Sequence, residues 1–308
     1  MEKYVIPGDF DDASLKYLYM SRRLGTMRAA ADALGVSPSS VSRQISHLEE
    51  KLGVELVEKR SHKVRLSQAG QFVYEYYKER LVHKEVLLTN LDDLKGMRKG
   101  HYTLAVSEGF ISTMLFNTLA AYATAYPGVR LDIITSSTQE IINMVSEDLA
   151  HIGFIFETSP DPRIRVKFVI DQSHKAIMSS THPLAKQDSV NLRDLAKFPL
   201  ILPKQEFRIR HALSIVEQAQ GIRLQPTIAT NSILLMRELV KHMEGVSIIS
   251  ELSVNDELDS GNLVALPIND EELQDAKIDV ITRLGRVLPA GAQAILDILA
   301  REMNKPQR

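Results

Sequence analysis

The hydrophobic periodicity of this 308-residue chain changes near residue 100, and this change limits the folds that it can adopt. Up to residue 94 the apolar residues recur at helical spacing. From Tyr102 onwards, short strand-like runs alternate with helical stretches. Strands that alternate with helices form βαβ units with mostly parallel sheets. We therefore predict an α/β chain whose N-terminal part is helical.

Capping residues divide the helical part into shorter elements. Thr26 and Ser37 are good N-caps, and Gly35 and Gly53 are good helix terminators. Pro38 takes the first position of a helix, where proline is favoured. We expect three short helices, over residues 12–23, 27–35 and 38–52.

The next segment predicts a β-hairpin followed by a long helix. Apolar residues between Val54 and Leu66 alternate with polar ones around a polar tip, as in two paired strands. Ser67 is a good N-cap for a helix that continues to Leu94, about 28 residues or about 42 Å. Such a rod cannot bury its apolar stripe against itself, so we expect a partner helix from a second copy.

A basic segment with two glycines, residues 95–102, predicts a hinge before the alternating part. Strands are expected at residues 102–107, 129–135, 152–156, 175–179, 200–202, 227–229, 247–250 and 278–282. Helices are expected at residues 111–126, 138–149, 208–220, 232–243 and 290–303.

The helix expected over residues 38–52 keeps carboxylates away from its first turns. Its exposed N-terminal half is neutral or cationic, and Glu49 and Glu50 come only near its end. Free N–H groups and the helix dipole at such an N-terminus favour a phosphate. Arg43 can bond guanine, and Gln44 could read adenine if it turns outward. Serines that only cap and solvate are the alternative, but the preceding helix and glycine turn have helix-turn-helix spacing.

The distribution of charge along the chain also favours an anionic partner for the N-terminal part. Residues 1–100 hold 17 Lys and Arg against 14 Asp and Glu, and the remainder holds 20 against 25. A mildly basic front on an acidic body suits a polyanionic partner. The hairpin contributes Lys59, Arg60, Lys63 and Arg65, which form either a solvated face or a wing that contacts DNA.

The stretch "RAAADALGVSPSSVSRQISHLEEKLGVELVEKRSHKVRLSQAGQ" resembles the DNA-binding domain of LysR-type transcriptional regulators. The shared features are the Ala-Ala pair, "SRQI", "LEEKLG" and a run ending in L-S-x-A-G. The rest of the chain fits this family in length and order. The chain departs from the family at Pro38, Val57, Lys59 and His62, where Gln, Phe, Arg and Arg are usual.

The resemblance implies three domains and their partners. They are a winged helix-turn-helix over 9–67 (helix-turn-helix about 27–46), a linker and dimerisation helix over 68–95, and an effector domain over 100–304. The effector domain would resemble a periplasmic binding protein, with lobe I at about 100–171 and 276–304 and lobe II at about 172–275. Implied partners are double-stranded promoter DNA, a small-molecule effector and further copies in a homodimer or homotetramer. RNA polymerase is a further candidate partner, and no metal or cofactor is expected.

Residues expected to contact DNA lie on the second and third helices and in the wing. They are Thr26, Arg28, Ser37, Pro38, Ser39, Ser40, Ser42, Arg43, Gln44, Lys59, Arg60 and Lys63.

Four junctions between a strand and a helix carry polar residues: "LAVSEGF", "ITSSTQE", "LPKQEF" and "ATNS". Each could be a plain N-cap, but together they predict a ligand cleft, where the family also places its effector contacts. Expected effector-binding residues are Ser107, Phe110, Ser136, Ser137, Thr138, Phe156, Pro203, Lys204, Phe207, Thr230 and Asn231. Lys204 and Arg208 would suit a carboxylate effector, whereas Glu108 would oppose it or would receive an amine.

Other classes are less well supported. No H-E-x-x-H, G-x-x-x-x-G-K or G-x-S-x-G motif indicates an enzyme, and His151, His174, His182 and His242 are isolated and expected at the surface. The absence of cysteine excludes disulfides and thiolate metal sites.

A solute-binding protein would share the lobes but would need an export signal, and the N-terminus does not resemble one. No run approaches the roughly 18 apolar residues of a membrane helix. We therefore expect a cytoplasmic protein with no membrane partner. A DNA-binding regulator with no effector remains an alternative.

Overall fold

The structure is a computed structural model that describes residues 11–58, 63–94, 99–156, 161–205, 207–270, 273 and 276–303, without the side chains of 92–94. The chain divides into two compact units, Met1–Leu88 and Thr89–Arg308.

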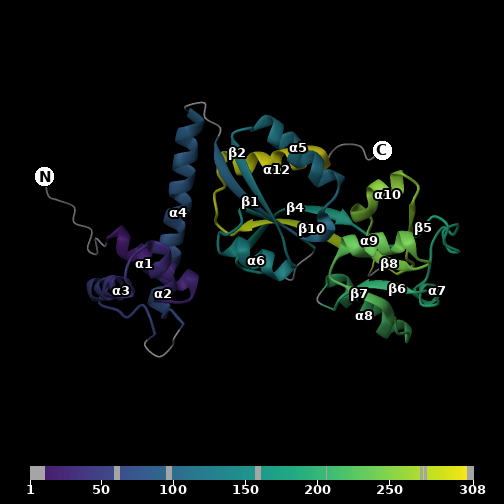
Figure 1. Cartoon of the computed structure of the whole chain (residues 1–308), viewed down its shortest axis with the longest axis horizontal. Coiled ribbons are helices and arrows are strands. Elements are labelled where there is room, and N and C mark those ends of the chain that lie inside the picture. Colours follow the sequence, from purple (N-terminus) through teal and green to yellow (C-terminus); the bar gives the residue numbers. More distant parts are fainter. Residues whose placement is uncertain are drawn as a thin grey trace. The chain divides into compact units, whose positions relative to one another are not determined.

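The first unit is helical (Figure 1). Its elements are α1 (Asp12–Leu24), α2 (Met27–Leu34), α3 (Pro38–Leu52) and most of α4 (Gln68–Leu94). The expected caps are confirmed, because the Thr26 and Ser37 side chains accept hydrogen bonds from the backbone N–H groups of Ala29 and Ser40. Gly35 and Gly53 end α2 and α3 in the left-handed conformation that glycine adopts without strain.

The core of this unit joins the three short helices to the start of α4. Leu18 of α1, Ala31 of α2 and Ile45 of α3 are buried together. The Tyr19 ring stacks on that of Tyr74 in α4, with 5.2 Å between the ring centroids. The apolar face predicted for α3 therefore lies inside, and its polar face is left outside.

The segment between α3 and α4 differs from the predicted hairpin. A single antiparallel bridge joins Val57 and Leu66, and no strand forms in the part of this segment that the structure describes. A Glu49 carboxylate oxygen accepts hydrogen bonds from the N–H groups of Leu56 (2.7 Å) and Val57 (3.1 Å). Backbone hydrogen bonds from the Glu58 N–H to the Arg65 oxygen (3.0 Å) and from the Ser67 N–H to the Leu56 oxygen (2.9 Å) flank the bridge, so the predicted antiparallel pairing is present but short.

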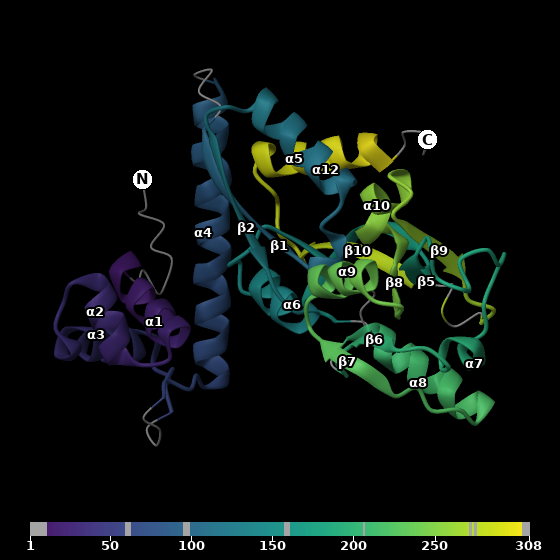
Figure 2. The ribbon, with the colours of Figure 1, turned by 45° about the vertical axis from the view of Figure 1, so that its right-hand side comes forward.

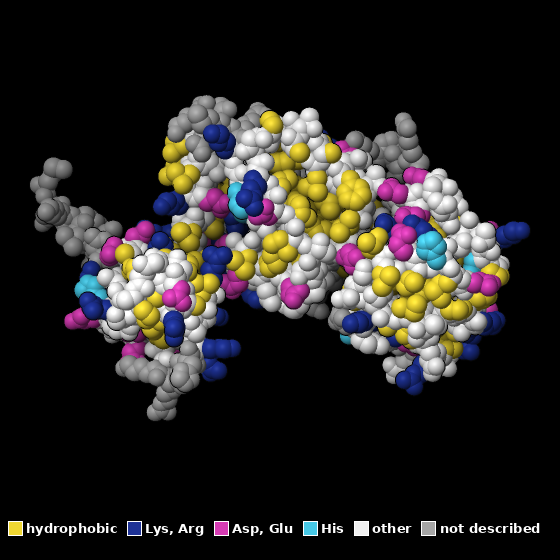
Figure 3. Space-filling view, in the orientation of Figure 1, with side chains coloured by type: hydrophobic (Ala, Val, Ile, Leu, Met, Phe, Trp, Pro, Cys, Tyr) yellow, Lys and Arg dark blue, Asp and Glu magenta, His cyan; other side chains and the backbone are white. Residues whose placement is uncertain are grey.

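Helix α4 starts where it was expected, since the Ser67 hydroxyl accepts a hydrogen bond from the Gly70 N–H. Gly70 lies against the wing, and a Cβ added there would approach the Leu56 carbonyl oxygen to 2.0 Å. An apolar stripe along α4 is left uncovered (Figure 3). It consists of Phe72, Tyr76, Leu81, Leu87, Leu88 and Leu91.

The second unit contains two five-stranded sheets (Figures 1 and 2). Lobe I has the order β2-β1-β3-β10-β4, with β1 Gly100–Val106, β2 Val129–Thr135, β3 Ile152–Phe156, β4 Ile164–Gln172 and β10 Ala276–Arg283. Lobe II has the order β7-β6-β8-β5-β9, with β5 His174–Ser179, β6 Leu200–Pro203, β7 Pro226–Thr230, β8 Val246–Ser250 and β9 Leu263–Pro267.

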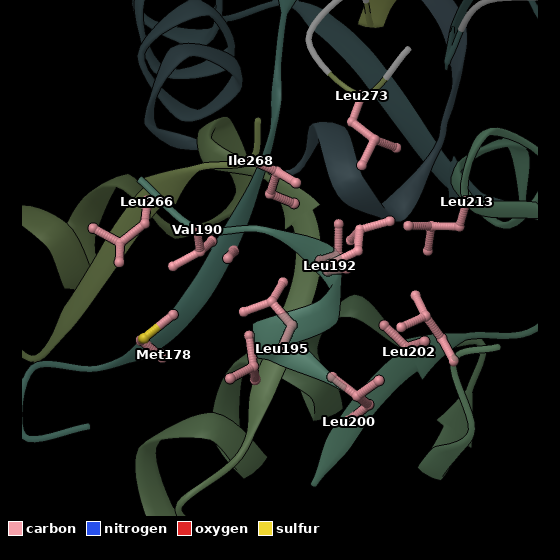
Figure 4. Close-up of a cluster of buried hydrophobic side chains, with 14 of the residues drawn as sticks. Met178, Val190, Leu192, Leu195, Leu200, Leu202, Leu213, Leu266, Ile268 and Leu273 are labelled. Carbon is pink, nitrogen blue, oxygen red and sulfur yellow. The ribbon is translucent and has the colours of Figure 1, made fainter. Parts of the chain in front are cut away.

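Helices cover both faces of each sheet. In lobe I, α5 (Thr113–Ala125) and α12 (Ala290–Met303) share one core with the sheet, and α6 (Thr138–Ser146) shares the other. In lobe II, α7 (Leu192–Leu195) and α8 (Arg208–Gln220) lie on one face, and α9 (Ile233–His242) lies on the other. The apolar side chains of the α7 and α8 face converge in Figure 4. The short helix α10 (Asn255–Asp259) follows β8.

The α/β class is confirmed, but the expectation of mostly parallel sheets is wrong in part. The pairs β1–β2, β1–β3, β6–β7 and β6–β8 are parallel, whereas β10 is antiparallel to β3 and β4, and β5 is antiparallel to β8 and β9. Strands β4 and β9 were not predicted. Strand β4 is an edge strand that carries charged residues between its apolar ones, and β9 is only five residues long.

Among the helices that the structure describes, none is long and apolar enough to cross a bilayer.

Candidate DNA-binding surface and effector cleft

The N-terminal half of α3 exposes small polar and cationic side chains. Pro38, Ser39, Ser42 and Arg43 are exposed, and the first turn contains no acidic residue. The hydroxyl of the capping Ser37 lies 2.9 Å from that of Ser39 and 2.8 Å from that of Ser40. This end of the helix is therefore capped by neutral groups and keeps its attraction for an anion.

The two acids of α3 lie toward its other end. Glu49 is turned toward the wing, where it accepts the two backbone hydrogen bonds described above. Glu50 is exposed, with 4.0 Å between its carboxylate and the His47 ring. Neither carboxylate lies on the turns that carry Ser39 and Arg43.

Gln44 does not turn outward, as reading adenine would require. Its side chain is half-buried, and its carbonyl oxygen accepts a hydrogen bond of 2.8 Å from the Ser14 hydroxyl on α1. Gln44 thus ties α3 to α1. Turning its side chain outward would break this hydrogen bond.

Other expected DNA contacts lie beside α3. Thr26 is half-buried as the cap of α2, and Arg28 and Lys63 are exposed. Lys59 and Arg60 lie outside the residues that the structure describes.

A cleft of about 400 Å³ lies between the lobes of the second unit. The residues that follow β1, β2 and β7 line it, together with the last residues of β3 and β8 and the first turn of α8. Of the expected effector contacts, it brings together Ser107, Ser136, Ser137, Thr138, Phe156, Phe207 and Asn231. The carboxyl ends of parallel strands thus meet at one site, as such sheets favour.

Two helices that begin at this cleft have a serine N-cap, Ser137 for α6 and Ser232 for α9, to which a glutamate carboxylate is added. At α6, the Glu140 carboxylate accepts hydrogen bonds from the Ser136 and Ser137 hydroxyls and from the Ser137 N–H. These bonds hold the pKa of Glu140 below its ordinary value. The Glu140 carboxylate is therefore ionised. Its negative charge already lies at the start of α6, so this helix offers little further attraction to an anion.

At α9, the added carboxylate comes from the opposite lobe. The Glu108 carboxylate accepts hydrogen bonds from the Ser232 hydroxyl (3.0 Å) and from the N–H groups of Ile233 (2.9 Å) and Leu234 (3.2 Å). The bonds join lobe I to lobe II across the cleft. Glu108 therefore helps to hold the lobes together, as does the Thr113 hydroxyl, which donates to the Asp256 carboxylate (2.6 Å).

Helix α8 begins differently. Its N-cap, Phe207, makes no side-chain capping bond, and the first residue of the helix is the exposed Arg208. Both residues line the cleft. Among the residues that the structure describes, Arg208 is the cationic side chain of the cleft, so its lobe II wall can attract a negatively charged group.

Two buried polar atoms in the cleft have no hydrogen-bond partner. They are the Ser107 hydroxyl oxygen and the Nδ1 atom of His174, whose residues are 7% and 9% exposed. Burial lowers the pKa of His174 to about 4, so its imidazole is neutral. A backbone hydrogen bond to Leu273 involves the same ring. Buried polar groups are usually paired, so both atoms are available to a ligand.

Four expected effector contacts lie elsewhere. Phe110 is fully buried and stacks on the core residue Phe154, with 4.9 Å between the ring centroids. Pro203 and Lys204 line a separate cavity of lobe II. Thr230 is buried, and its hydroxyl accepts a hydrogen bond from the Ser232 N–H. These residues lie at or just after strand ends, but none of them lines the cleft.

The sequence analysis missed other lining residues, chiefly Glu140 and His174. The expectation that His151, His174 and His182 lie at the surface is wrong, because all three are buried, whereas His242 is exposed. His174 is the first residue of β5, directly after the crossing between the lobes. No local pattern marks such a residue, because its neighbours in the cleft come from other parts of the chain.

No group of three or more His, Asp or Glu side chains suitable for a metal ion occurs among the residues that the structure describes.

Known families match both parts of the chain. The profile described as "LysR substrate binding domain" matches residues 95–304, and "Bacterial regulatory helix-turn-helix protein, lysR family" matches residues 13–71. The HTH-type transcriptional activator CmpR of Synechocystis is 26% identical over 280 residues, which cover 90% of this chain and 90% of that protein.

Solved structures share the fold. HinK, a LysR family transcriptional regulator from Pseudomonas aeruginosa, is 20% identical with a TM-score of 0.56, covering 96% of this chain and 99% of that one. Full-length CbnR complexed with its target DNA is 20% identical with a TM-score of 0.54, covering 96% and 100%.

Proposed function

This chain belongs to the LysR family of transcriptional regulators, and from that premise we propose which residues read its DNA and what its cleft binds. It is a DNA-binding transcriptional regulator with an effector domain and not an enzyme. We retain the domain bounds of 9–67, 68–95 and 100–304, with the lobes at about 100–171 and 276–304 and at about 172–275.

We propose that α3 enters the major groove with its N-terminal half. The observation that supports this most is the absence of acidic residues from its first turn, beside exposed Ser39, Ser42 and Arg43. Arg43 would bond guanine, and Ser39, Ser40 and Ser42 would donate to phosphates or base edges. Thr26, Arg28, Ser37, Pro38, Lys59, Arg60 and Lys63 are retained as neighbouring contacts. Gln44 is retained only through its amide N–H groups, since Ser14 engages its oxygen.

We propose that α4 pairs with α4 of a second copy. Phe72 is 69% exposed and Leu87 57% exposed, although helices rarely leave so wide an apolar stripe in water. Pairing would place two α3 helices on half-sites one or more helical turns apart. A homotetramer would then consist of two such dimers.

We propose that the effector is a small polar molecule with one carboxylate. The open start of α8 and Arg208 would receive the carboxylate, while Ser107 and His174 would bond its polar groups. A second anionic group would meet Glu108 or Glu140 and be repelled. An amine at Glu108 is the competing arrangement, but that carboxylate already accepts three hydrogen bonds.

Thermal unfolding of the full chain with a panel of small carboxylic acids, each paired with its amide, tests the effector. An acid that binds the folded state raises the Tm, and we expect its amide to have less effect. In Arg208→Gln this preference should vanish, and Ser107→Ala should lose the response while retaining DNA affinity. If no compound raises the Tm, the alternative of a regulator without an effector is favoured.

Two further proposals, the cellular location and a protein partner, rest on family membership alone. We propose that the protein acts in the cytoplasm, where the DNA is, and that it contacts RNA polymerase at the promoter. Crosslinking of the DNA-bound protein to the polymerase, with and without the effector, tests the second proposal.

A further inference from the structure

A second cavity of about 560 Å³ lies in lobe II, outside the effector cleft. Residues at the end of β6, on α8 and at the start of β7 form its walls, and none of them lines the cleft. Arg208 lines the cleft, whereas Arg210 lines this cavity. Residues two positions apart lie on nearly opposite sides of a helix, so α8 separates the two spaces.

Among the residues that the structure describes, none forms an ion pair with the guanidinium of Arg210. The residue is 5% exposed, and its Nη1 atom is buried without a hydrogen-bond partner. Nearby polar groups on the helix are used otherwise. The Ser214 hydroxyl donates to the Arg210 carbonyl oxygen (2.8 Å), and a Glu217 oxygen accepts from the Leu224 N–H. A buried charge without a partner is costly, so a missing anion would account for this arrangement.

The rim of the cavity is also cationic. Lys204 and Arg223 are exposed there, and the one carboxylate among the described lining residues, Glu217, already holds the loop before β7. Gln205 and Gln225 add amide N–H groups. The walls thus present three cations and several donors, which suit the oxygens of a small anion.

We propose that this cavity binds a small oxyanion, a phosphate, sulfate or carboxylate group, with Arg210 as its buried partner and Lys204 and Arg223 at its rim. Arg210 lies within one turn of Phe207 and Arg208 on α8. A bound anion would therefore fix the turn that forms one wall of the effector cleft. This site is independent of the proposed effector and of the proposed DNA contacts.

Thermal unfolding of the full chain in sodium phosphate, sulfate or acetate, against sodium chloride of equal ionic strength, tests the proposal. We expect a saturable rise in Tm with at least one of the three oxyanions, and the anion that acts defines the ligand class. Arg210→Met should have a higher Tm than the parent in chloride, because the unpaired charge is gone, and should lose the oxyanion response. Arg223→Gln, changed only at the rim, should fold normally and need several-fold more oxyanion.

Arg208→Gln is the matched control, because it removes a cation from the other side of the same helix. It should keep the full response to phosphate and sulfate, and acetate is not compared in this variant because Arg208 also receives the carboxylate of the proposed effector. The proposal is wrong if the parent shows no response, if Arg210→Met and Arg223→Gln both respond like the parent, or if Arg208→Gln alone abolishes the response. Light scattering of Arg210→Met gives its oligomeric state. If this variant forms a smaller oligomer and the parent shows no oxyanion response, Arg210 is a subunit contact and the proposal is wrong.

Discussion

The helices of the two units begin in contrasting ways. The N-terminus of α3 in the first unit is capped by the neutral hydroxyl of Ser37 alone, with no acid in its first turn. In the second unit, α6 and α9 also begin with a serine cap, but the carboxylates of Glu140 and Glu108 accept further backbone hydrogen bonds there. The same backbone dipole is therefore left open to an anion in α3 and satisfied within the chain in α6 and α9.

This difference indicates what each unit can receive. A surface helix with an open N-terminus suits phosphates arranged along a duplex, which attract cations and repel carboxylates. In a cleft where α6 and α9 already hold carboxylates, an anion is attracted to the cation among the described lining residues, Arg208 at the start of α8. If the proposed contacts are right, the first unit accepts phosphates of any duplex at this helix end, and the second accepts a narrower set of anions.

The largest expected effect concerns the neutrality of His174 in the cleft. Its folded pKa of about 4 lies below the ordinary 6.5, so at intermediate pH the unfolded chain binds a proton that the folded chain does not. The stability that this contributes is present above about pH 6.5 and falls by about 3 kcal/mol as the pH approaches 4. Urea unfolding across this range should show His174→Gln losing less stability than the parent. His242→Gln, at an exposed histidine, is the control and should lose as much stability as the parent. An equal loss of stability in His174→Gln and the parent would contradict a buried, neutral His174.

The next effect concerns base reading by α3. Arg43→Ala should cost about 1–3 kcal/mol of DNA binding energy at one base pair, because a bidentate contact to guanine is lost. Fluorescence anisotropy with a set of single-base operator variants measures this. Lys51→Ala, at the far end of α3, should change little. A uniform loss on all sequences would assign Arg43 to a phosphate instead.

A carboxylate placed at the start of α3 gives this helix the feature that distinguishes α6 and α9, and so tests the difference between the two units directly. Ser39→Glu should weaken DNA binding by about 1–2 kcal/mol at low salt, since it faces phosphates. The same change should stabilise the helix by about 0.3–1 kcal/mol through the dipole. Ser39→Gln is the neutral control for both measurements. If the two variants bind DNA equally, the helix start does not approach phosphate.

The smallest effect comes from removing a carboxylate that closes a helix. Glu108→Gln should lower the stability of the second unit by about 1 kcal/mol, because charge-assisted capping of α9 is weakened. It should also let a dicarboxylic acid raise the Tm, because less repulsion remains in the cleft. Exposed Glu244→Gln serves as the control. Unchanged stability together with unchanged selectivity would show that Glu108 does not govern the cleft.

The sequence predicted the first unit well because its signals are local. Caps, terminating glycines and the buried face of α3 all lie within a few residues of one another, and the helices were placed correctly. Gln44 was the exception, because its partner Ser14 lies thirty residues earlier, on another helix. The predicted pairing of the wing is present but short, and the side chain of Glu49 accepts two of its backbone N–H groups from outside the pair.

The cleft was predicted only in part because it is assembled from distant segments. Hydroxyl residues after strands identified Ser107 and Ser136 to Thr138. Whether such a residue faces the cleft depends on strand twist and helix direction, which put Phe110 in the core and Lys204 at another cavity. His174 depends on the antiparallel pairing of β5 with β8, and alternation of strands and helices does not predict that pairing.

The most direct test of the DNA-binding helix start is an anisotropy titration of the full chain with a duplex from upstream of its own gene. We expect binding tighter than to an unrelated duplex, with log Kd rising linearly with log salt as phosphate contacts are screened. A failure to distinguish the two duplexes, or to bind either one at about 50 mM salt, would contradict the account of α3.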